Sequence, residues 1–188
     1  MPNWCNNTIT LTGPKAKITK IYEKAKEDNA FLQQLHPMPA ELEDTTKGSN
    51  GDAFNWYDWR VENWGTKWDV DMDGLELSDD GTTITGWFDS AWAPPIHAYE
   101  YFLTDNEDCS ISSLYYEGGM DFAGKWEDFA DMTVTPGDFT ADEMEDPNSG
   151  LIYDINENFN MSEWVREYEE EQKTETEKFI VDKEAVNV

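Results

Sequence analysis

Apolar and polar residues alternate in the segment NNTITLTG, residues 6–13, which puts Ile9 and Leu11 on one face. A period of two is typical of a half-buried β-strand, and Gly13-Pro14 ends the pattern. Over residues 14–29 the apolar spacing changes to three and four, which predicts a helix. The apolar stripe of this helix consists of Ile18, Ile21, Tyr22 and Ala25.

Similar patterns continue to residue 129. They predict a short aromatic helix at 53–65, a longer helix at 95–105, and strands at 66–72, 82–90, 109–119 and 120–129. The order β-α-β-β-α-β, with additions, predicts an α+β fold of the ferredoxin-like, split β-α-β type. We expect residues 3–118 to form a four-stranded antiparallel sheet with two helices on one face. Its first and fourth strands are neighbours, which could bring Cys5 and Cys109 close together.

The acid density rises after residue 128, so we expect two parts: residues 1–128, and an acidic C-terminal extension at 129–188. Within the extension, DFTADEMEDPNSG (138–150) predicts a short acidic helix or loop, and LIYDI (151–155) predicts a brief strand. The segment NMSEWVREYEEEQKTETEKF predicts a final helix that begins at Asn160, with Glu163 completing its cap. We expect Trp164 and Tyr168 to dock this helix.

The composition indicates a folded chain despite its charge. A net charge of -28 over 188 residues would suggest disorder, but 14% aromatic residues and nine tryptophans indicate a core. The chain has no apolar run of 18 residues, and its start lacks the basic-then-apolar layout of a signal peptide. We therefore expect a soluble, cytoplasmic protein. Its two cysteines are too few for a disulfide framework, so free thiols are expected.

Five ordered motifs carry a family resemblance: MPNWCNNTITLTGP, PMPAEL, WYDWRVENWGTKWDV, FDSAWAPP and YYEGGMDFAGKW. Together they resemble the YubB-type ferredoxin-like proteins of plasmids and bacteriophages, over residues 1 to about 128. The resemblance implies a ferredoxin-like fold, an origin in a mobile genetic element and a place in the cytoplasm of a bacterial host. It assigns no reaction and no cofactor. Two cysteines could not supply the four thiolates of an iron–sulfur cluster.

One acidic stretch has the spacing of a metal site. Asp69, Asp71 and Asp73, followed by Gly74, match the opening of a calcium-binding helix–loop–helix motif. That motif needs a helix running into its first position, which Gly65-Thr66 interrupts, and a glutamate at the twelfth position, where Asp80 stands. We therefore favour an acidic strand edge, with Asp69 and Asp71 on one face, and keep the metal site as the alternative.

The tryptophan-rich motifs NWGTKWD and AWAPP predict a pocket if they meet in space. Its lining would be Arg60, Trp64, Lys67, Trp68 and Trp92, because aromatic walls with a few polar groups suit a small ligand. The alternative, which we favour, is that these tryptophans are core and rim packing.

Catalysis and nucleic-acid binding receive little support from the sequence. His36 and His97 belong to no recognisable nucleophile–base pair, so we expect no enzyme. RNA-binding modules share the ferredoxin-like topology, but Trp87 and Phe88 fall on opposite faces of their strand and the local charge is negative.

Negative charge concentrates toward the C-terminus. Residues 1–100 hold 8 Lys+Arg against 17 Asp+Glu, and residues 101–188 hold 5 against 24. The forty residues between Lys125 and Arg166 contain eleven acids and no base. Such a field repels nucleic acid and anionic membranes, and a basic protein is its natural complement.

This charge leads to a functional hypothesis. Carboxylates spaced along helices and loops can imitate the phosphates of duplex DNA. We therefore expect a non-enzymatic accessory protein that binds and inhibits a basic host protein, such as a defence or nucleic-acid-binding protein. The predicted binding residues are Asp128, Asp131, Asp138, Asp142, Glu143, Glu145 and Asp146. One alternative is that the acidic region is a solvated appendage that only solubilises the chain. The other is a small-ligand or metal-binding module built on the tryptophan motifs.

Overall fold

The computed structural model describes residues 3–47, 51, 53–171 and 174. The chain forms two compact units, Met1–Val134 and Thr135–Val188. The first unit contains a six-stranded sheet in the order β2-β3-β1-β4-β5-β6, and every neighbouring pair is antiparallel. Its strands are β1 (Trp4–Thr12), β2 (Leu75–Leu77), β3 (Thr83–Ala91), β4 (Ser110–Glu117), β5 (Phe122–Glu127) and β6 (Ala130–Val134).

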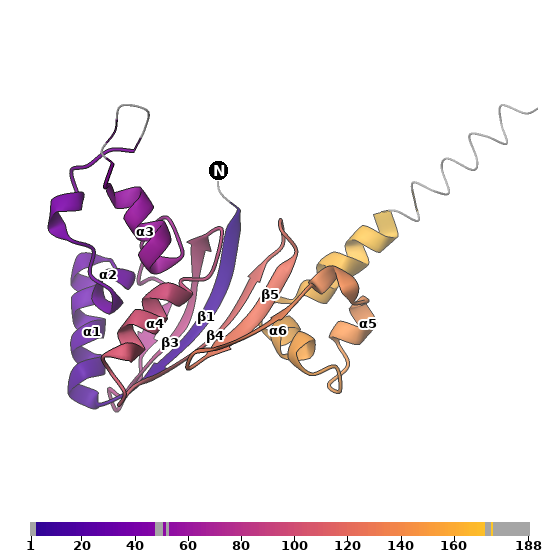
Figure 1. The fold of residues 1–188 in the computed structure, drawn as a ribbon. Coiled ribbons are helices and arrows are strands. Elements are labelled where there is room, and N and C mark those ends of the chain that lie inside the picture. The colour runs from indigo at the N-terminus through magenta and orange to yellow at the C-terminus, as the bar shows by residue number, and fades with distance from the viewer. Residues whose placement is uncertain (1–2, 48–50, 52, 172–173, 175–188) are drawn as a thin grey trace, which may run out of the picture. The chain divides into compact units, whose positions relative to one another are not determined.

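The longer helices of the first unit lie on one side of this sheet (Figure 1). The helical segments are α1 (Lys15–Asp28), α2 (Leu32–Leu35), η1 (Ala40–Leu42), α3 (Trp56–Trp64) and α4 (Ile96–Thr104). The α+β class and the antiparallel sheet are therefore confirmed. The sheet extends beyond the four strands expected for residues 3–118, because β5 and β6 continue it past β4.

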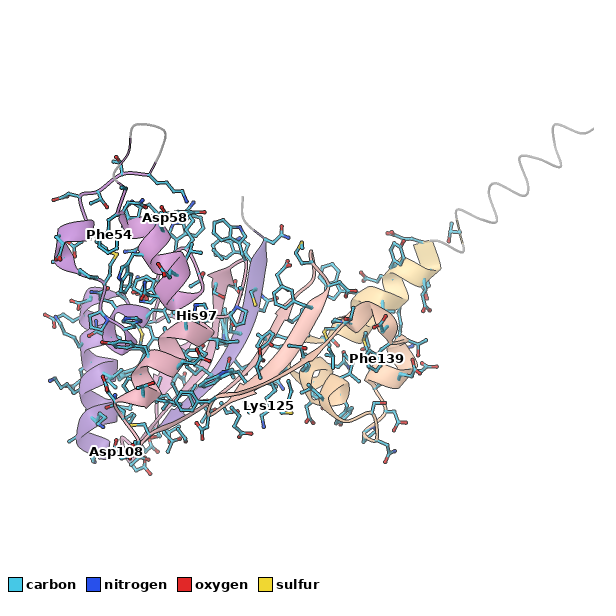
Figure 2. The ribbon with its side chains drawn as sticks, in the orientation of Figure 1. Phe54, Asp58, His97, Asp108, Lys125 and Phe139 are labelled. Carbon is cyan, nitrogen blue, oxygen red and sulfur yellow. The ribbon has the colours of Figure 1, made fainter. Side chains whose placement is uncertain are left out.

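The core forms between the helices and the alternate side chains of the strands. In β1 the buried positions alternate with exposed or half-buried ones, as the period of two predicts. The helices supply Ile18 and Ala25 from α1 and Tyr99 and Phe102 from α4. Trp126 of β5 is 1% exposed, so the core extends beyond β4. Lys125, next to it in β5, lies on the sheet side away from the helices (Figure 2).

The predicted strand at 66–72 is wrong. The backbone of this segment pairs with no strand, and β2 begins only at Leu75 and is three residues long. Val70 and Met72 are nevertheless buried, and the carbonyl of Val70 accepts a hydrogen bond from the Phe31 N–H at 3.2 Å. The alternating pattern therefore reflects packing against the α1–α2 connection instead of a sheet ladder.

The expected proximity of the two cysteines is also wrong. Thr12 pairs with Ser110 and Asn6 pairs with Tyr116, so the antiparallel register puts Cys5 and Cys109 at opposite ends of the β1–β4 pair. Both cysteines are free thiols.

The sequence-based boundary at residues 128/129 falls in the turn between β5 and β6. Asp128 and Phe129 form this turn with φ angles of 43° and 72°. Strand β6 then pairs with β5 along its whole length, and the first unit ends at Val134.

The regular elements in the described part of the second unit are all helices. Its elements are η2 (Pro136–Asp138), α5 (Ala141–Met144), α6 (Leu151–Phe159) and a helix at residues 161–171. The short acidic helix and the final helix agree with the prediction, although residues 172, 173 and 175–179 of the latter lie outside the described residues. The brief strand predicted at LIYDI is wrong: Ile152 and Ile155, three residues apart, form the buried face of α6.

The predicted docking of the final helix is wrong as well. Trp164 is 69% exposed and Tyr168 is 64% exposed, whereas Met161 and Ser162 at the helix start are buried. The N–H of Ser162 donates to the Asn156 side-chain oxygen at 2.8 Å. The start of the helix is therefore held by α6, and its two large aromatic side chains face solvent.

Candidate functional site

A cavity of about 310 Å³ lies at the edge of β3 in the first unit. One side is the segment 68–73 and the other is the second half of β3, with Trp4 of β1 beside it. The volume is at the lower end of the range for small-ligand pockets. The residues that line it include no Lys, Arg or His: Trp4, Trp68, Asp69, Val70, Asp71, Asp73, Trp87, Phe88, Asp89, Ser90 and Ala91.

Two anchors hold the segment 66–74 against β3 and leave the cavity between them. At one end, the Thr66 hydroxyl donates to the Ala91 carbonyl and accepts from the Ala91 N–H, both at 2.9 Å. At the other end, the Gly74 carbonyl accepts from the Trp87 N–H at 3.0 Å. Between these anchors the segment leaves the edge of β3, and the cavity occupies the position that a longer β2 would fill.

Asp69 fixes the outer wall of the cavity. Its carboxylate accepts hydrogen bonds from the backbone N–H groups of Leu32 (2.7 Å), Gln33 (2.9 Å) and Val70 (2.8 Å). It thereby caps the first turn of α2 from a distant part of the sequence. Burial raises the pKa of the Asp69 carboxyl, while the three N–H groups and the nearby charge of Arg60 act in the opposite direction.

This role of Asp69 bears on both interpretations of the acidic stretch, the strand edge and the metal site. Asp69 and Asp71 do not share a strand face, because their segment is not a strand. The Asp71 carboxylate accepts from the Asp73 N–H at 3.2 Å, and Asp71 and Asp73 are exposed. Within the described residues, no group of three or more His, Cys, Asp or Glu side chains is arranged to hold a metal ion.

Three tryptophans border the cavity on the exposed face of the sheet. Trp4 lies opposite Ala91 in the β1–β3 pair, and its ring centroid is 5.8 Å from that of Trp68, with the planes tilted by 34°. Since β1 and the 66–74 segment flank β3 on opposite sides, these two rings meet across β3. Trp87 stands at the other end of the cavity and is 63% exposed.

Glycines hold Trp87 in place despite its exposure. A Cβ at Gly74 would overlap the Trp87 carbonyl oxygen and lie 3.0 Å from its ring atom Cδ2. The indole therefore rests directly on the Gly74 backbone. Gly86, with φ of 148°, lets β3 approach the Gly74 carbonyl, which any Cβ at residue 86 would overlap.

The sequence-predicted pocket differs from this cavity. The motifs NWGTKWD and AWAPP do come together, through the Thr66–Ala91 hydrogen bonds. Trp64 is completely buried and donates its indole N–H to the His36 carbonyl at 2.8 Å, so it is a core residue. Of the five predicted pocket residues, only Trp68 lines the cavity. Arg60 lies over the rings of Trp56 and Trp64, at 5.2 and 4.8 Å from their centroids.

Lys67 and Trp92 form a cluster beside the cavity and share Trp68 with it. The Lys67 ammonium lies 4.4 Å from the ring centroid of Trp68 and 5.7 Å from that of Trp92, and the Tyr57 ring is 5.6 Å away. Trp92 is 37% exposed and has φ of 74°. Cation–π attraction explains why an ammonium group settles among these rings.

Sequence reasoning missed Trp4, Trp87 and Asp89 as cavity residues. The period of two along β3 does put Trp87 and Asp89 on the same face, and this signal was available. The position of Trp4 beside them depends on the β1–β3 register, which a single sequence does not show.

The predicted acidic binding residues divide between the two units. Asp128 and Asp131 belong to the first: the Asp128 carboxylate accepts from the Ile111 N–H at 2.8 Å, and that of Asp131 accepts from the Tyr115 hydroxyl at 2.6 Å. Both bonds stabilise the β4–β5–β6 region. These two carboxylates therefore have structural partners in the sheet.

The remaining predicted acids lie in the second unit, on and beside α5. The carboxylate of Glu143 caps α5 by accepting from the Thr140 N–H at 2.8 Å, and that of Asp146 accepts from the Asn148 N–H at 2.9 Å. Asp138 lies in η2 and is exposed. The acids Asp142 and Glu145 form ion pairs with Arg166, at 3.1 and 2.5 Å.

The two histidines bind the end of α3. Nδ1 of His36 lies 3.1 Å from the Asn63 carbonyl, and Nδ1 of His97, on α4, lies 2.9 Å from the Glu62 carbonyl (Figure 2). His36 also stacks on Tyr101, with ring centroids 3.4 Å apart. Both imidazoles thus hydrogen-bond to backbone carbonyls at the C-terminus of a helix, where a histidine N–H is a suitable donor.

No family model, curated protein or solved structure matches this chain. The resemblance to YubB-type proteins therefore stays a prediction. None of the helices in the described part of the chain has the length and apolar content needed to cross a membrane.

Proposed function

We propose that this protein acts by binding a basic surface on another protein, without catalysis, through the carboxylates of its second unit. The observation that carries the proposal is the charge of that unit. Residues 135–171 contain twelve Asp and Glu residues and a single base, Arg166. A nucleic-acid-binding protein has the complementary surface, because it contacts phosphates with Lys and Arg. Occupying that surface would inhibit its binding to DNA or RNA.

The local structure around α5 supports this proposal, because it keeps neighbouring carboxylates charged. Hydrogen bonds from the Thr140 N–H and hydroxyl lower the pKa of Glu143, and bonds from the Asn148 N–H and side chain lower the pKa of Asp146. The Arg166 guanidinium, followed by Ser162, lowers the pKa of Glu145. These carboxylates consequently stay ionised at neutral and mildly acidic pH.

We also propose that the first unit has a ferredoxin-like core and that the protein originates from a mobile genetic element. In favour of the former, α1 follows β1, α4 follows β3, and the first four strands have the spatial order β2-β3-β1-β4. On this proposal β5, β6 and the second unit are additions to that core. The partner is then a protein of the bacterial host, such as a defence or nucleic-acid-binding protein.

A small-ligand-binding module is the second candidate function. The cavity beside β3 favours it, since tryptophans and carboxylates converge there on a volume of about 310 Å³. The two functions use different residues, so they can be tested separately.

The proposal is tested by retention of bacterial lysate proteins on the immobilised protein. We compare the parent with a quadruple variant, Asp142→Asn, Glu143→Gln, Glu145→Gln and Asp146→Asn. A glutamine at residue 143 can still cap α5, so the helix is expected to remain. At low salt the variant should retain about tenfold less of the proteins that also bind duplex DNA, because steering by the acidic surface is lost.

A matched control removes four carboxylates from the first unit: Glu23→Gln, Glu76→Gln, Asp105→Asn and Glu107→Gln. These side chains are exposed, and the control has the same net charge as the quadruple variant. It should retain proteins as the parent does. Equal losses in the two variants would show that total charge alone is responsible, and no loss in the first would exclude α5 as the binding surface.

A further inference from the structure

The cavity beside β3 combines two features that attract the same chemical group. Its aromatic lining consists of Trp4, Trp68, Trp87 and Phe88, and tryptophan is the aromatic residue that binds cations best. Its charged groups are four aspartates, and no lining residue is basic. The Lys67 ammonium lies 4.4 Å from the ring centroid of Trp68, so one tryptophan of the lining already contacts a cation. The four carboxylates of the lining still favour a cation over an anion.

The same lining selects an organic cation over a metal ion. Magnesium and calcium require several oxygen ligands at short distances. Asp69 is occupied by three backbone N–H groups, and the described residues contain no cluster of metal-ligating side chains. Indole rings have no oxygen atoms that could coordinate a metal ion. They do gain from contact with the methylene groups of an alkylammonium ion.

The arrangement along β3 indicates an elongated ligand. Trp87, Asp89 and Ala91 follow one another on the same strand face, and Trp4 lies opposite Ala91. Two-residue steps of a strand span about 7 Å, so Trp87 and the Trp4–Trp68 pair are roughly 13 Å apart along the backbone. The Asp89 carboxylate lies between them, held by the Asn6 side-chain amide at 2.7 Å.

The backbone of β3 adds an acceptor to the cavity. The N–H groups of Trp87 and Ala91 both bond to the 66–74 segment, away from β1. Hydrogen-bonding directions alternate along an antiparallel strand, so the peptide groups of Asp89 point to the same side. Its carbonyl is therefore directed at the cavity, where an ammonium group could donate to it.

We infer that this cavity binds a linear alkylammonium group, with its carbon chain on the tryptophans and its ammonium at Asp89 and at Asp71 or Asp73. This inference names the ligand class of the second candidate function and is independent of the acidic surface on α5. Two sources supply the same chemistry: a free diamine or polyamine, and a lysine side chain of another protein. The Trp87 ring packs against the Gly74 backbone, which positions one wall of the cavity.

The test follows the indole N–H signals of the full-length protein by NMR during titration with 1,4-diaminobutane. Signals of Trp4, Trp68 and Trp87, assigned with single Trp→Phe variants, should shift, and that of the buried Trp64 should not. Two probes separate the possible causes: 1,4-butanediol has a similar shape without charge, and Mg²⁺ has the same charge without the carbon chain. Each should bind at least about tenfold more weakly at these indoles.

Two variants test whether the Trp87 ring and the Asp89 charge contribute to diamine binding. Trp87→Leu and Asp89→Asn should each weaken diamine binding by about tenfold, while Trp164→Leu, at another exposed tryptophan, should leave it unchanged. Melting temperatures of all variants are measured to confirm folding, and Trp87 is exposed enough for its loss to be tolerated. Lysate retention through α5 should be the same in all three variants, so the two proposals can fail separately.

A third probe distinguishes the sources. Nα-acetyl-lysine methylamide binding more tightly than diaminobutane would identify a lysine side chain as the ligand, and the reverse order would identify a free amine. The inference is overturned if Mg²⁺ or butanediol shifts the three indole signals as strongly as the diamine does. It is also overturned if Trp87→Leu and Trp164→Leu bind the diamine equally well.

Discussion

At the scale of single residues, the Asp69 carboxylate joins two segments that are far apart in the sequence. It accepts three backbone N–H bonds, two of them from the first turn of α2, and so holds the cavity wall against the helical layer. Asp71, two residues later, is exposed, and among the residues that the structure describes its carboxylate accepts a hydrogen bond only from the nearby Asp73 N–H. Two chemically identical side chains therefore have different roles because of their environment.

This difference predicts unequal costs of substitution. Asp69→Asn replaces one acceptor oxygen by an amide donor that would face N–H groups, so the free energy of unfolding should fall by about 1–3 kcal/mol. Asp71→Asn should change it by less than about 0.5 kcal/mol, as is usual at exposed positions. Urea denaturation of both variants measures this. Equal effects would contradict the capping role of Asp69.

His36 predicts a dependence of stability on pH. Burial lowers its pKa from the ordinary value of 6.5, and its bond to the Asn63 carbonyl opposes that shift. Below pH 6.5 the unfolded chain therefore takes up a proton that the folded protein resists, so the contribution of His36 to stability decreases as the pH falls through this window.

The variant His36→Phe keeps a ring against Tyr101 and removes the titration. The difference in free energy of unfolding between parent and variant should be constant from pH 8 to 7.5 and should shrink between pH 7 and 5.5. The comparison cancels the carboxylates that titrate in both proteins. A difference that stays constant across the whole range would show that His36 does not couple protonation to folding.

At the scale of elements, the 66–74 segment shows how far the sequence could predict the fold. The alternation of Trp68, Val70 and Met72 with aspartates correctly indicated that Val70 and Met72 are buried, but the backbone bends at 66–68 and 72 and forms no strand. A period of two does not specify the hydrogen-bonding partner: the middle of the segment bonds to the α1–α2 connection, and only its ends, at Thr66 and Gly74, bond to β3. For the same reason the cavity, which depends on this displacement, could not be predicted.

The first strand, the long helices and the antiparallel sheet were predictable because their apolar periods extend over many residues. Shorter elements were not. LIYDI has the β-branched residues of a strand, but Ile152 and Ile155 pack as one helical face between Gly150 and Asn160, which begin and end α6. The final helix was predictable from its cap, and its exposed aromatic side chains were not.

The close contact between Gly74 and Trp87 predicts that a side chain at residue 74 disturbs the cavity. A Cβ there would overlap the backbone of Trp87, so Gly74→Ala should lower the free energy of unfolding by about 1–3 kcal/mol and displace the Trp87 ring. Gly118→Ala is the control, because the atoms nearest to a Cβ at that position belong to the outer end of the Tyr116 side chain and not to backbone. Thermal melts and the Trp87 indole signal measure both effects. An unchanged Trp87 signal in Gly74→Ala would contradict the packing of Trp87 against Gly74.

At the scale of the whole molecule, charge dominates. The chain has a net charge of -28, and such self-repulsion disfavours a compact state. The sequence suggested that the carboxylates between Lys125 and Arg166 have no compensating base, but Arg166 itself pairs with Asp142 and Glu145. That contact joins residues more than twenty positions apart, so sequence-local charge counting could not reveal it.

The Arg166 pairs do not remove the acidic character of α5. Both are exposed ion pairs, which contribute little to stability and are screened by salt. A basic partner could compete with Arg166 for Asp142 and Glu145. On the proposed function, α5 and the residues beside it therefore present carboxylates that replace nucleic acid on a basic protein.

Displacement of DNA tests this claim most directly. A DNA-binding protein retained from the bacterial lysate is loaded with fluorescent duplex DNA, and the parent or the quadruple α5 variant is added at low salt. The parent should release the DNA, and the α5 variant should require about tenfold more protein for the same release. The matched first-unit variant should behave as the parent does. Equal release by the parent and the α5 variant, or no release by either, would contradict this claim.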